Sequence, residues 1–206
     1  MDIVLLSGWS NAGKDFIADM FLNYGYTKLS FAGELKKIVA ETYNIPLELT
    51  MTQEGKRTIH DKTGKSIREL LIQEARQIRE RYGDGYFAKC VAITIQKQSS
   101  NKIILSDWRF PVELETLKSM FYKKDVKIYT VRVHRRGQYY SPIPDTYTEN
   151  QLDFYSFDHQ FENPGSYDAS NSLSQQIENF FNTFNISYTI DKDTSCAAEI
   201  HGGINV

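Results

Sequence analysis

Gly8-Trp9-Ser10-Asn11-Ala12-Gly13-Lys14 is the stretch of this sequence that decides its fold, because it matches the phosphate-binding pattern G-x-x-x-x-G-K. Residues 3–7 directly before it form a continuous apolar run, which is typical of a strand buried on both faces. Residues 14–23 after it carry apolar side chains at helical spacing. Two glycines between a strand and a helix let successive backbone N–H groups point at phosphate oxygens. The sequence therefore predicts a phosphate site here, with a glycine-rich turn without function as the alternative.

Lys14 and Asp15 open the expected helix and are the first candidates for chemistry. Lys14 is expected to reach the β- and γ-phosphates of ATP as a point charge. Asp15 stands where a serine or threonine usually contacts Mg²⁺. A carboxylate at this place can hold the ion through a water, because Mg²⁺ keeps much of its hydration shell. The alternative is that Asp15 only stabilises the first turn of the helix.

The rest of the chain alternates between strand and helix patterns. We expect strands at residues 27–31, 102–106, 126–133 and 186–190. We expect helices at residues 34–43, from Ser66 to the turn at 83–85, from that turn to about residue 98, after Pro111, and at 172–184. Ser66 and Glu69 stand in capping-box positions at the start of the long helix. Strands separated by helices predict an α/β fold with a mainly parallel sheet of roughly five strands.

The composition is that of an ordinary globular protein and argues against several classes. The chain has 206 residues, of which 41% are hydrophobic and 24% charged, enough for one domain with small appended lobes. A formal net charge of −2 argues against a nucleic-acid partner, and no apolar run reaches the roughly 18 residues of a membrane span. Cys90 and Cys196 are too few for a disulfide framework, and the first apolar run is too short for a signal peptide. We therefore expect a cytoplasmic protein that does not bind membranes.

Asp107-Trp108-Arg109 follows the expected strand at 102–106, and ligands of parallel sheets bind at the carboxyl ends of strands. The phosphate pattern also follows a strand, so the two segments are expected at one edge of the sheet. Asp107 can hold water on Mg²⁺ or orient a substrate group, and Arg109 can form a bidentate contact with a phosphate. The alternative is a buried structural pair of Asp107 with Arg109.

These motifs, taken with their neighbours, resemble a known group of enzymes. Gly8–Asp15 followed by Phe16, and then Ser30–Lys36, resemble the opening of the deoxynucleoside monophosphate kinases of phages and large DNA viruses. The animal-type phosphomevalonate kinases, of the same P-loop group, share this pattern. The resemblance continues through Arg68–Leu71, Arg79–Phe87, Ser106–Phe110 with Glu113, and Glu149–Gly165.

The resemblance implies a P-loop nucleoside-monophosphate-kinase fold within residues 1–190. Its core would comprise 1–44, 101–133 and 157–190, with an acceptor lobe at about 45–100, a lid at about 134–156 and a tail at 191–206. Arg135 and Arg136 would close over the transferring phosphoryl group and act in catalysis with Lys14, Asp15 and Asp107. Asn163 and Gly165 would lie in the loop that holds the adenine of ATP, and Asp15 and Asp107 would hold Mg²⁺ through water.

Transfer to a phosphate acceptor needs no strong general base, because the attacking oxygen is already anionic. Catalysis then requires cations around both phosphates. The acceptor candidates are Lys36, Lys56, Arg57, Arg68, Gln73, Arg76, Arg79, Tyr86 and Arg109. Gln73, Arg76, Tyr82 and Tyr86 can supply a flat slot for a base. For Lys36 the alternative is a charge on a helix face, and for Arg68 a side chain in solvent.

The sequence as a whole predicts ATP-dependent phosphorylation of deoxynucleoside monophosphates to diphosphates, with ATP and Mg²⁺ as cofactors. Small molecules are the expected partners, a homodimer stays open, and a viral protein would work in the host cytoplasm. The nearest alternative is a phosphomevalonate kinase, which differs in its acceptor lobe. An alternative of another class is a regulatory protein that binds ATP without turnover, against which the set of Lys14, Asp15, Asp107 and the two lid arginines argues.

Overall fold

The strand before the phosphate pattern is the centre of the sheet. In the computed structural model, which describes residues 1–137, 150–165 and 169–190, β1 (Asp2–Ser7) lies between β5 (Lys102–Leu105) and β6 (Lys127–Arg135) and pairs with both in parallel. Residues 3–6 of β1 are fully buried, as its continuous apolar run predicts.

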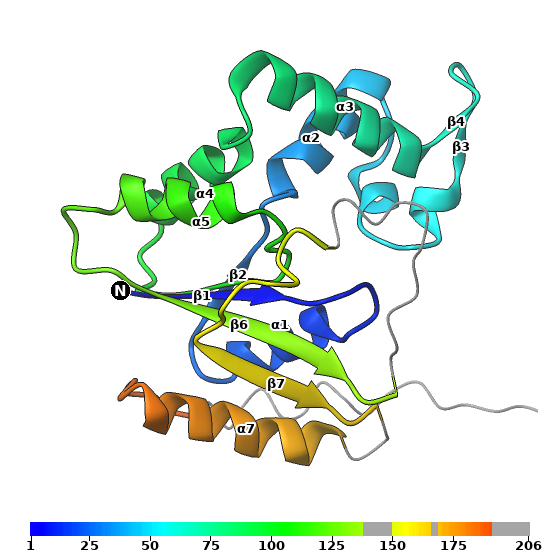
Figure 1. Cartoon of the computed structure of the whole chain (residues 1–206). Helices are drawn as coiled ribbons and strands as arrows, with labels where there is room; N and C mark the ends of the chain where they lie inside the picture. Colours follow the sequence, from blue (N-terminus) through cyan, green and yellow to red (C-terminus); the bar gives the residue numbers. More distant parts are fainter. Residues whose placement is uncertain (138–149, 166–168, 191–206) are drawn as a thin grey trace, which may run out of the picture.

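Two edge strands complete the sheet, which is shown in Figure 1. β2 (Thr27–Leu29) pairs with β5, and β7 (His159–Asn163) pairs with β6, so the order is β2-β5-β1-β6-β7 and every pairing is parallel. The prediction of an α/β fold with about five parallel strands flanked by helices is confirmed. The predicted strand at 186–190 is wrong, because Ile186 and Tyr188 instead pack on the core beside α7 and the fifth strand is β7.

Alternate residues of β1 face opposite sides of the sheet, and each side has its own core. Val4 and Leu6 lie in the core formed with α1 (Lys14–Leu22) and α7 (Ala169–Thr183). Figure 1 shows α7 along the bottom of the molecule. The core on this side is largely aromatic, with the rings of Phe21, Tyr24, Tyr26, Phe161, Phe180 and Phe181.

The other face of the sheet is covered by α4 (Tyr86–Lys97) and α5 (Pro111–Met120), which lie above it in Figure 1. Trp108 is fully buried in this core with Ile3 and Leu5 of β1. Residues 150–158, which we call the strap, extend this core, and Tyr155 and Phe157 contact Trp108 edge to face at centroid distances of 5.0 and 5.6 Å.

A lobe joins β2 to α4 and rises at the upper right of Figure 1. It consists of α2 (Gly33–Tyr43), η1 (Leu47–Thr50), η2 (Gly55–Arg57), the hairpin of β3 (Ile59–His60) and β4 (Lys65–Ser66), and α3 (Ile67–Tyr82). The expected capping box is confirmed, because Ser66 accepts from the Glu69 N–H while the Glu69 carboxylate accepts from the Ser66 N–H.

Parts of the predicted lid and tail lie outside the described residues, namely 138–149 and all of 191–206. Among the helices in the described ranges, none has the length and apolar character needed to cross a membrane. The division into core, acceptor lobe and lid stays a prediction. In this structure α4 buries its apolar face mainly against the sheet, whereas α2 and α3 share a separate core.

Candidate active site

The phosphate loop, residues 8–14, needs its two glycines for reasons of space. A Cβ atom on Gly8 would lie 2.5 Å from the carbonyl oxygen of Val133 in β6. Gly13 has a φ of 96°, and a Cβ atom there would collide with the side-chain amide of Asn163. Because only glycine tolerates both the close approach and the positive φ, the loop can lie directly over the ends of β6 and β7.

Lys14 folds back over this loop. Its ammonium donates to the carbonyl oxygens of Gly8 at 2.6 Å and Trp9 at 2.8 Å. α1 begins at Lys14, so the positive end of the helix points into the same space. An anionic phosphate entering the loop would therefore meet an ammonium and the N–H groups of a helix start.

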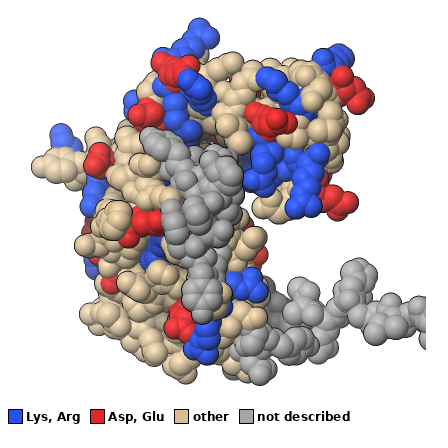
Figure 2. Space-filling view, turned by 45° about the vertical axis from the view of Figure 1, so that its right-hand side comes forward, with Lys and Arg blue, Asp and Glu red and all other residues tan. Residues whose placement is uncertain are grey.

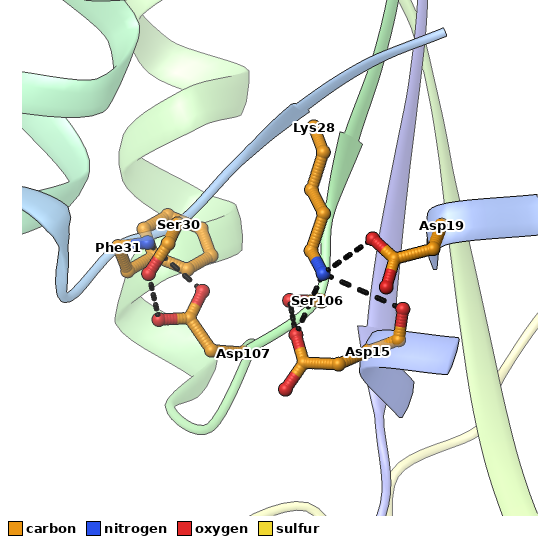
Figure 3. A network of polar contacts seen from close by, with 7 residues as sticks. All are labelled: Asp15, Asp19, Lys28, Ser30, Phe31, Ser106 and Asp107. Carbon is orange, nitrogen blue, oxygen red and sulfur yellow. Dashed lines mark hydrogen bonds and ion pairs between the residues drawn. The ribbon is translucent and has the colours of Figure 1, made fainter. Parts of the chain in front are cut away.

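Asp15 lies beside the loop in a network of polar side chains, drawn in Figure 3. Its Oδ1 accepts from the Ser106 hydroxyl at 2.7 Å and lies 3.1 Å from the Lys28 ammonium, which also contacts Asp19 at 2.9 Å. Partial burial raises the pKa of Asp15, but the hydrogen bonds and charges of Ser106, Lys28 and Lys14 lower it by more. The pKa of Asp15 therefore lies below its ordinary value. Asp15 is therefore an ionised carboxylate whose side chain is 79% exposed.

This setting fits a magnesium ion that keeps most of its water. Within the described parts of the chain no group of three or more His, Cys, Asp or Glu side chains could hold a metal by itself. Mg²⁺ in phosphoryl-transfer sites takes one or two carboxylates plus phosphate oxygens, and Asp15 beside Lys14 can supply one such carboxylate. Sequence patterns did not identify Lys28 or Asp19. Lys28 contacts Asp15 and Asp19 only because β2 pairs with β5 in the sheet.

Asp107 has a different environment, also shown in Figure 3. Its carboxylate accepts from the Ser30 hydroxyl at 2.7 Å and from the backbone N–H groups of Phe31 at 2.9 Å and Ala32 at 3.0 Å. It thereby caps the start of α2 from outside the helix. The structure therefore shows Asp107 fixing the lobe to the sheet. Its roles in catalysis and metal binding stay predictions.

The ends of β6 and β7 brace the far side of the loop. Asn163 is buried, donates from Nδ2 to the Ala12 carbonyl at 3.0 Å and accepts from the Gly165 N–H at 3.0 Å. Arg135 donates to the Asn11 carbonyl at 3.2 Å. Arg136 instead pairs with Glu162 at 2.5 Å and is exposed. The structure thus brings Asn163, Gly165 and Arg135 to the phosphate loop, while contact with adenine stays a prediction.

Four cations gather where the lobe meets the sheet. Lys56 of η2 has its pKa lowered, first by burial and then by the charges of Lys36, Arg68 and Arg109, while Asp15 acts in the opposite direction. We call Lys36, Lys56, Arg68 and Arg109 the basic cluster. Figure 2 shows Lys and Arg side chains gathered on the lobe beside a hollow between lobe and body. Because like charges held together are costly, this is a place where an anion would be stabilised.

A buried carboxyl group fixes the turn that carries Arg109. Glu113 is only 4% exposed and accepts from the backbone N–H groups of Arg109 at 3.0 Å and Phe110 at 3.1 Å. Burial raises the pKa of Glu113 to about 7, with the charge of Asp107 adding to the rise and the two N–H groups and Arg79 opposing it. Arg79 stacks over Phe110 at 4.7 Å and Phe87 at 5.4 Å. Arg79 is thus brought beside the turn that carries Arg109.

The remaining acceptor candidates are dispersed. Gln73 accepts from Lys65 at 2.5 Å and Arg76 pairs with Glu80 at 2.8 Å, all on a shallow groove along the outer face of α3. Tyr82 stacks on Tyr86 at 5.2 Å, but it lies nine positions after Gln73, which is about two and a half helical turns and hence the opposite side of α3. The predicted base slot is therefore not one surface. Arg57 is exposed. Arg68, which belongs to the basic cluster, donates to Gln53 at 2.6 Å.

Comparisons with known proteins give likenesses of fold only. No family model matches the chain, and no curated protein matches its sequence. Among solved structures, dephospho-CoA kinase from Campylobacter jejuni has a TM-score of 0.49 at 16% identity, covering 89% of this chain and all of that one. Shikimate kinase from Aquifex aeolicus has a TM-score of 0.41 at 12% identity, covering 90% of this chain and 99% of that one. The APS kinase CysC of Mycobacterium tuberculosis has a TM-score of 0.41 at 11% identity, covering 89% of this chain and 96% of that one. At these values the likeness does not extend to activity or substrate.

Proposed function

We propose that this chain is a kinase that transfers the γ-phosphoryl group of ATP to the phosphate of a small acceptor. The observation that carries the proposal is the meeting of two anion sites at one edge of the sheet. The phosphate loop with Lys14 forms the first, and the basic cluster forms the second. Asp15 belongs to the first, yet its charge acts on Lys56 of the second, so the two sites are neighbours.

In the proposed reaction the loop amides and Lys14 bind the β- and γ-phosphates of ATP. Asp15 would hold Mg²⁺ through water, and the ion would neutralise charge on the phosphates. Arg135, already at the Asn11 carbonyl, can turn toward the transferring group. The basic cluster would hold the acceptor phosphate in line with the γ-phosphate, so that catalysis consists of positioning and charge neutralisation.

We infer that the acceptor is a deoxynucleoside monophosphate. The basic cluster supports a phosphorylated acceptor of any kind, because it contains four cations and is built by the lobe together with Arg109. The deoxynucleotide itself rests on the resemblance of Gly8–Asp15, Ser30–Lys36 and Ser106–Phe110 to the viral kinases. With Gln73 and Arg76 on the outer face of α3, any contact with the base would fall to aromatic residues such as Tyr82 and Tyr86.

A coupled assay of ADP release tests the proposal. Mg-ATP is offered with each of the four deoxynucleoside monophosphates, their ribose counterparts and phosphomevalonate. We expect turnover with one or more deoxynucleotides. Turnover with phosphomevalonate alone would keep the kinase and replace its acceptor. Tight ATP binding without turnover for any acceptor would replace the enzyme by an ATP-binding regulatory protein.

A further inference from the structure

Arg132 is a buried arginine of β6 that the proposed reaction leaves without a role. Its Nη2 forms an ion pair with Oδ1 of Asp153 in the strap at 2.6 Å, and both side chains are largely buried. Its Nη1 lies 3.3 Å from the hydroxyl of Ser7, the last residue of β1. The guanidinium also lies over the rings of Trp9 and Phe157, at 5.8 and 5.6 Å from their centroids. Arg132 therefore fixes the position of Asp153.

The same oxygen of Asp153 reaches the phosphate loop. The indole N–H of Trp9 donates to Oδ1 at 3.1 Å, so one carboxylate oxygen binds both Arg132 and Trp9. Ser7 and Trp9 are the residues on either side of Gly8, where the chain leaves the strand and enters the loop. The buried ion pair thus contacts both flanks of the first glycine, from a segment more than 140 residues away in the sequence.

Trp9 connects this anchor to the lysine that is expected to bind phosphate. The carbonyl oxygen of Trp9 accepts from the Lys14 ammonium at 2.8 Å, while its side chain is held by Asp153. Backbone N–H groups stabilise a phosphate only if they are already oriented toward it. If the backbone of Trp9 changed its orientation, the loop N–H groups would point in another direction and Lys14 would lose its contact with the Trp9 carbonyl.

We propose that Asp153 is a positioning residue for the phosphate loop: it holds the indole of Trp9, and Arg132 holds Asp153. This inference rests on the proposed function, because it concerns the affinity of the loop for a nucleotide. A residue that only stabilised the strap would affect folding and leave that affinity unchanged. Asp158 offers the matched control, since it binds the backbone N–H and hydroxyl of Thr130 at 2.8 and 2.7 Å from the same strap without contacting the loop.

The experiment measures Mg-ADP affinity by calorimetry for the wild type, Trp9→Phe, Asp153→Ala and the double variant. We expect each single variant to weaken binding about tenfold, in line with the loss of one hydrogen bond to a charged group. The double variant is expected to be no weaker than Asp153→Ala, because both changes act through one contact. Asp158→Ala should be less stable yet bind Mg-ADP as the wild type does. The emission of Trp9 is the part of the wild-type tryptophan spectrum that is missing in Trp9→Phe. We expect this part to shift to the red in Asp153→Ala.

The outcomes separate the two proposals. If the wild type does not bind Mg-ADP, the proposed function is wrong. If the wild type binds and Trp9→Phe binds equally well, the positioning role is wrong and the kinase proposal is unaffected. Fully multiplicative losses in the double variant would also overturn it. Should Asp153→Ala fail to fold, Trp9→Phe still decides, because it keeps an aromatic ring and removes only the N–H donor with part of the ring.

Discussion

The phosphate loop and the basic cluster both suit anions, but they are stabilised in opposite ways. In the loop, charged and polar side chains bind backbone carbonyls: Lys14 binds those of Gly8 and Trp9, and Asn163 binds that of Ala12. In the basic cluster the charges of Lys36, Arg68 and Arg109 act against that of Lys56. The loop is therefore held by contacts within the protein, whereas the like charges of the cluster repel one another and favour the binding of an anion.

This difference has a consequence for both stability and activity. Changes in the loop should cost activity by removing contacts to the nucleotide, and some should also cost stability. Changes in the basic cluster should cost acceptor binding and increase the stability of the unliganded protein, the usual trade-off at a charged site. Four predictions test this difference, starting with the largest effect.

Lys14→Ala should abolish the function of the loop. We expect kcat/KM for ATP to fall about a thousandfold, the loss typical for one charged or hydrogen-bonding group that stabilises a transition state. The free energy of unfolding, measured in urea, should change by no more than about 1 kcal/mol, because the lost bonds are hydrogen bonds near solvent. A variant that retained a tenth of the wild-type rate would show that the loop lysine does not act on the phosphates.

Lys36→Ala should act on the other region. We expect the KM for the acceptor to rise roughly 10- to 100-fold, with the KM for ATP unchanged, because one charge-assisted contact to a phosphate is lost. Lys37→Ala is the matched control. Lys37 is the next residue in the chain, its ammonium lies 3.6 Å from the Glu34 carboxylate, and its side chain is 61% exposed. Equal kinetics for the two variants would place the acceptor phosphate away from the basic cluster.

The loop and the cluster also differ in how well the sequence predicts them. The loop is local, so the glycines, Lys14 and the flanking elements could be predicted from one stretch of chain. The same holds for the capping box of Ser66 and Glu69. The cluster joins α2, η2, α3 and the turn after β5. Its members were among several candidate cations, and only Arg109 was indicated by its position after an expected strand.

Contacts between distant segments explain what the sequence missed. β7 was not predicted because an edge strand with one buried face, His159–Asn163, has only Phe161 as a large apolar residue. The ion pair of Arg132 and Asp153 depends on where the strap lies, which no periodicity indicates. The separation of Gln73 from Tyr82 follows from helix geometry and could have been foreseen, because nine residues place them on opposite sides of α3.

Lys56→Met should stabilise the protein while it impairs acceptor binding. Burial and three like charges lower the pKa of Lys56, so its protonated form destabilises the folded state below that pKa. The cost is present at neutral pH and falls as the pH rises from the lowered pKa toward the ordinary value of a lysine. We expect a gain of roughly 0.5–2 kcal/mol in unfolding free energy at pH 7, which urea unfolding measures. A loss of stability in this variant would contradict the difference between the two regions.

Glu113→Gln should give the smallest effect and reveal how the cluster is held. Burial raises the pKa of Glu113 to about 7, so between the ordinary value near 4.5 and about 7 the folded state holds a proton that the unfolded state has lost. The stability of the wild type should therefore fall as the pH rises through this window, whereas Glu113→Gln lacks this contribution. Urea unfolding at pH 5 and pH 8 measures the difference between the two proteins. Because the amide oxygen can still accept from Arg109 and Phe110, the acceptor KM should rise no more than about threefold. A larger rise would mean that the negative charge of Glu113, and not only its hydrogen bonds, positions Arg109.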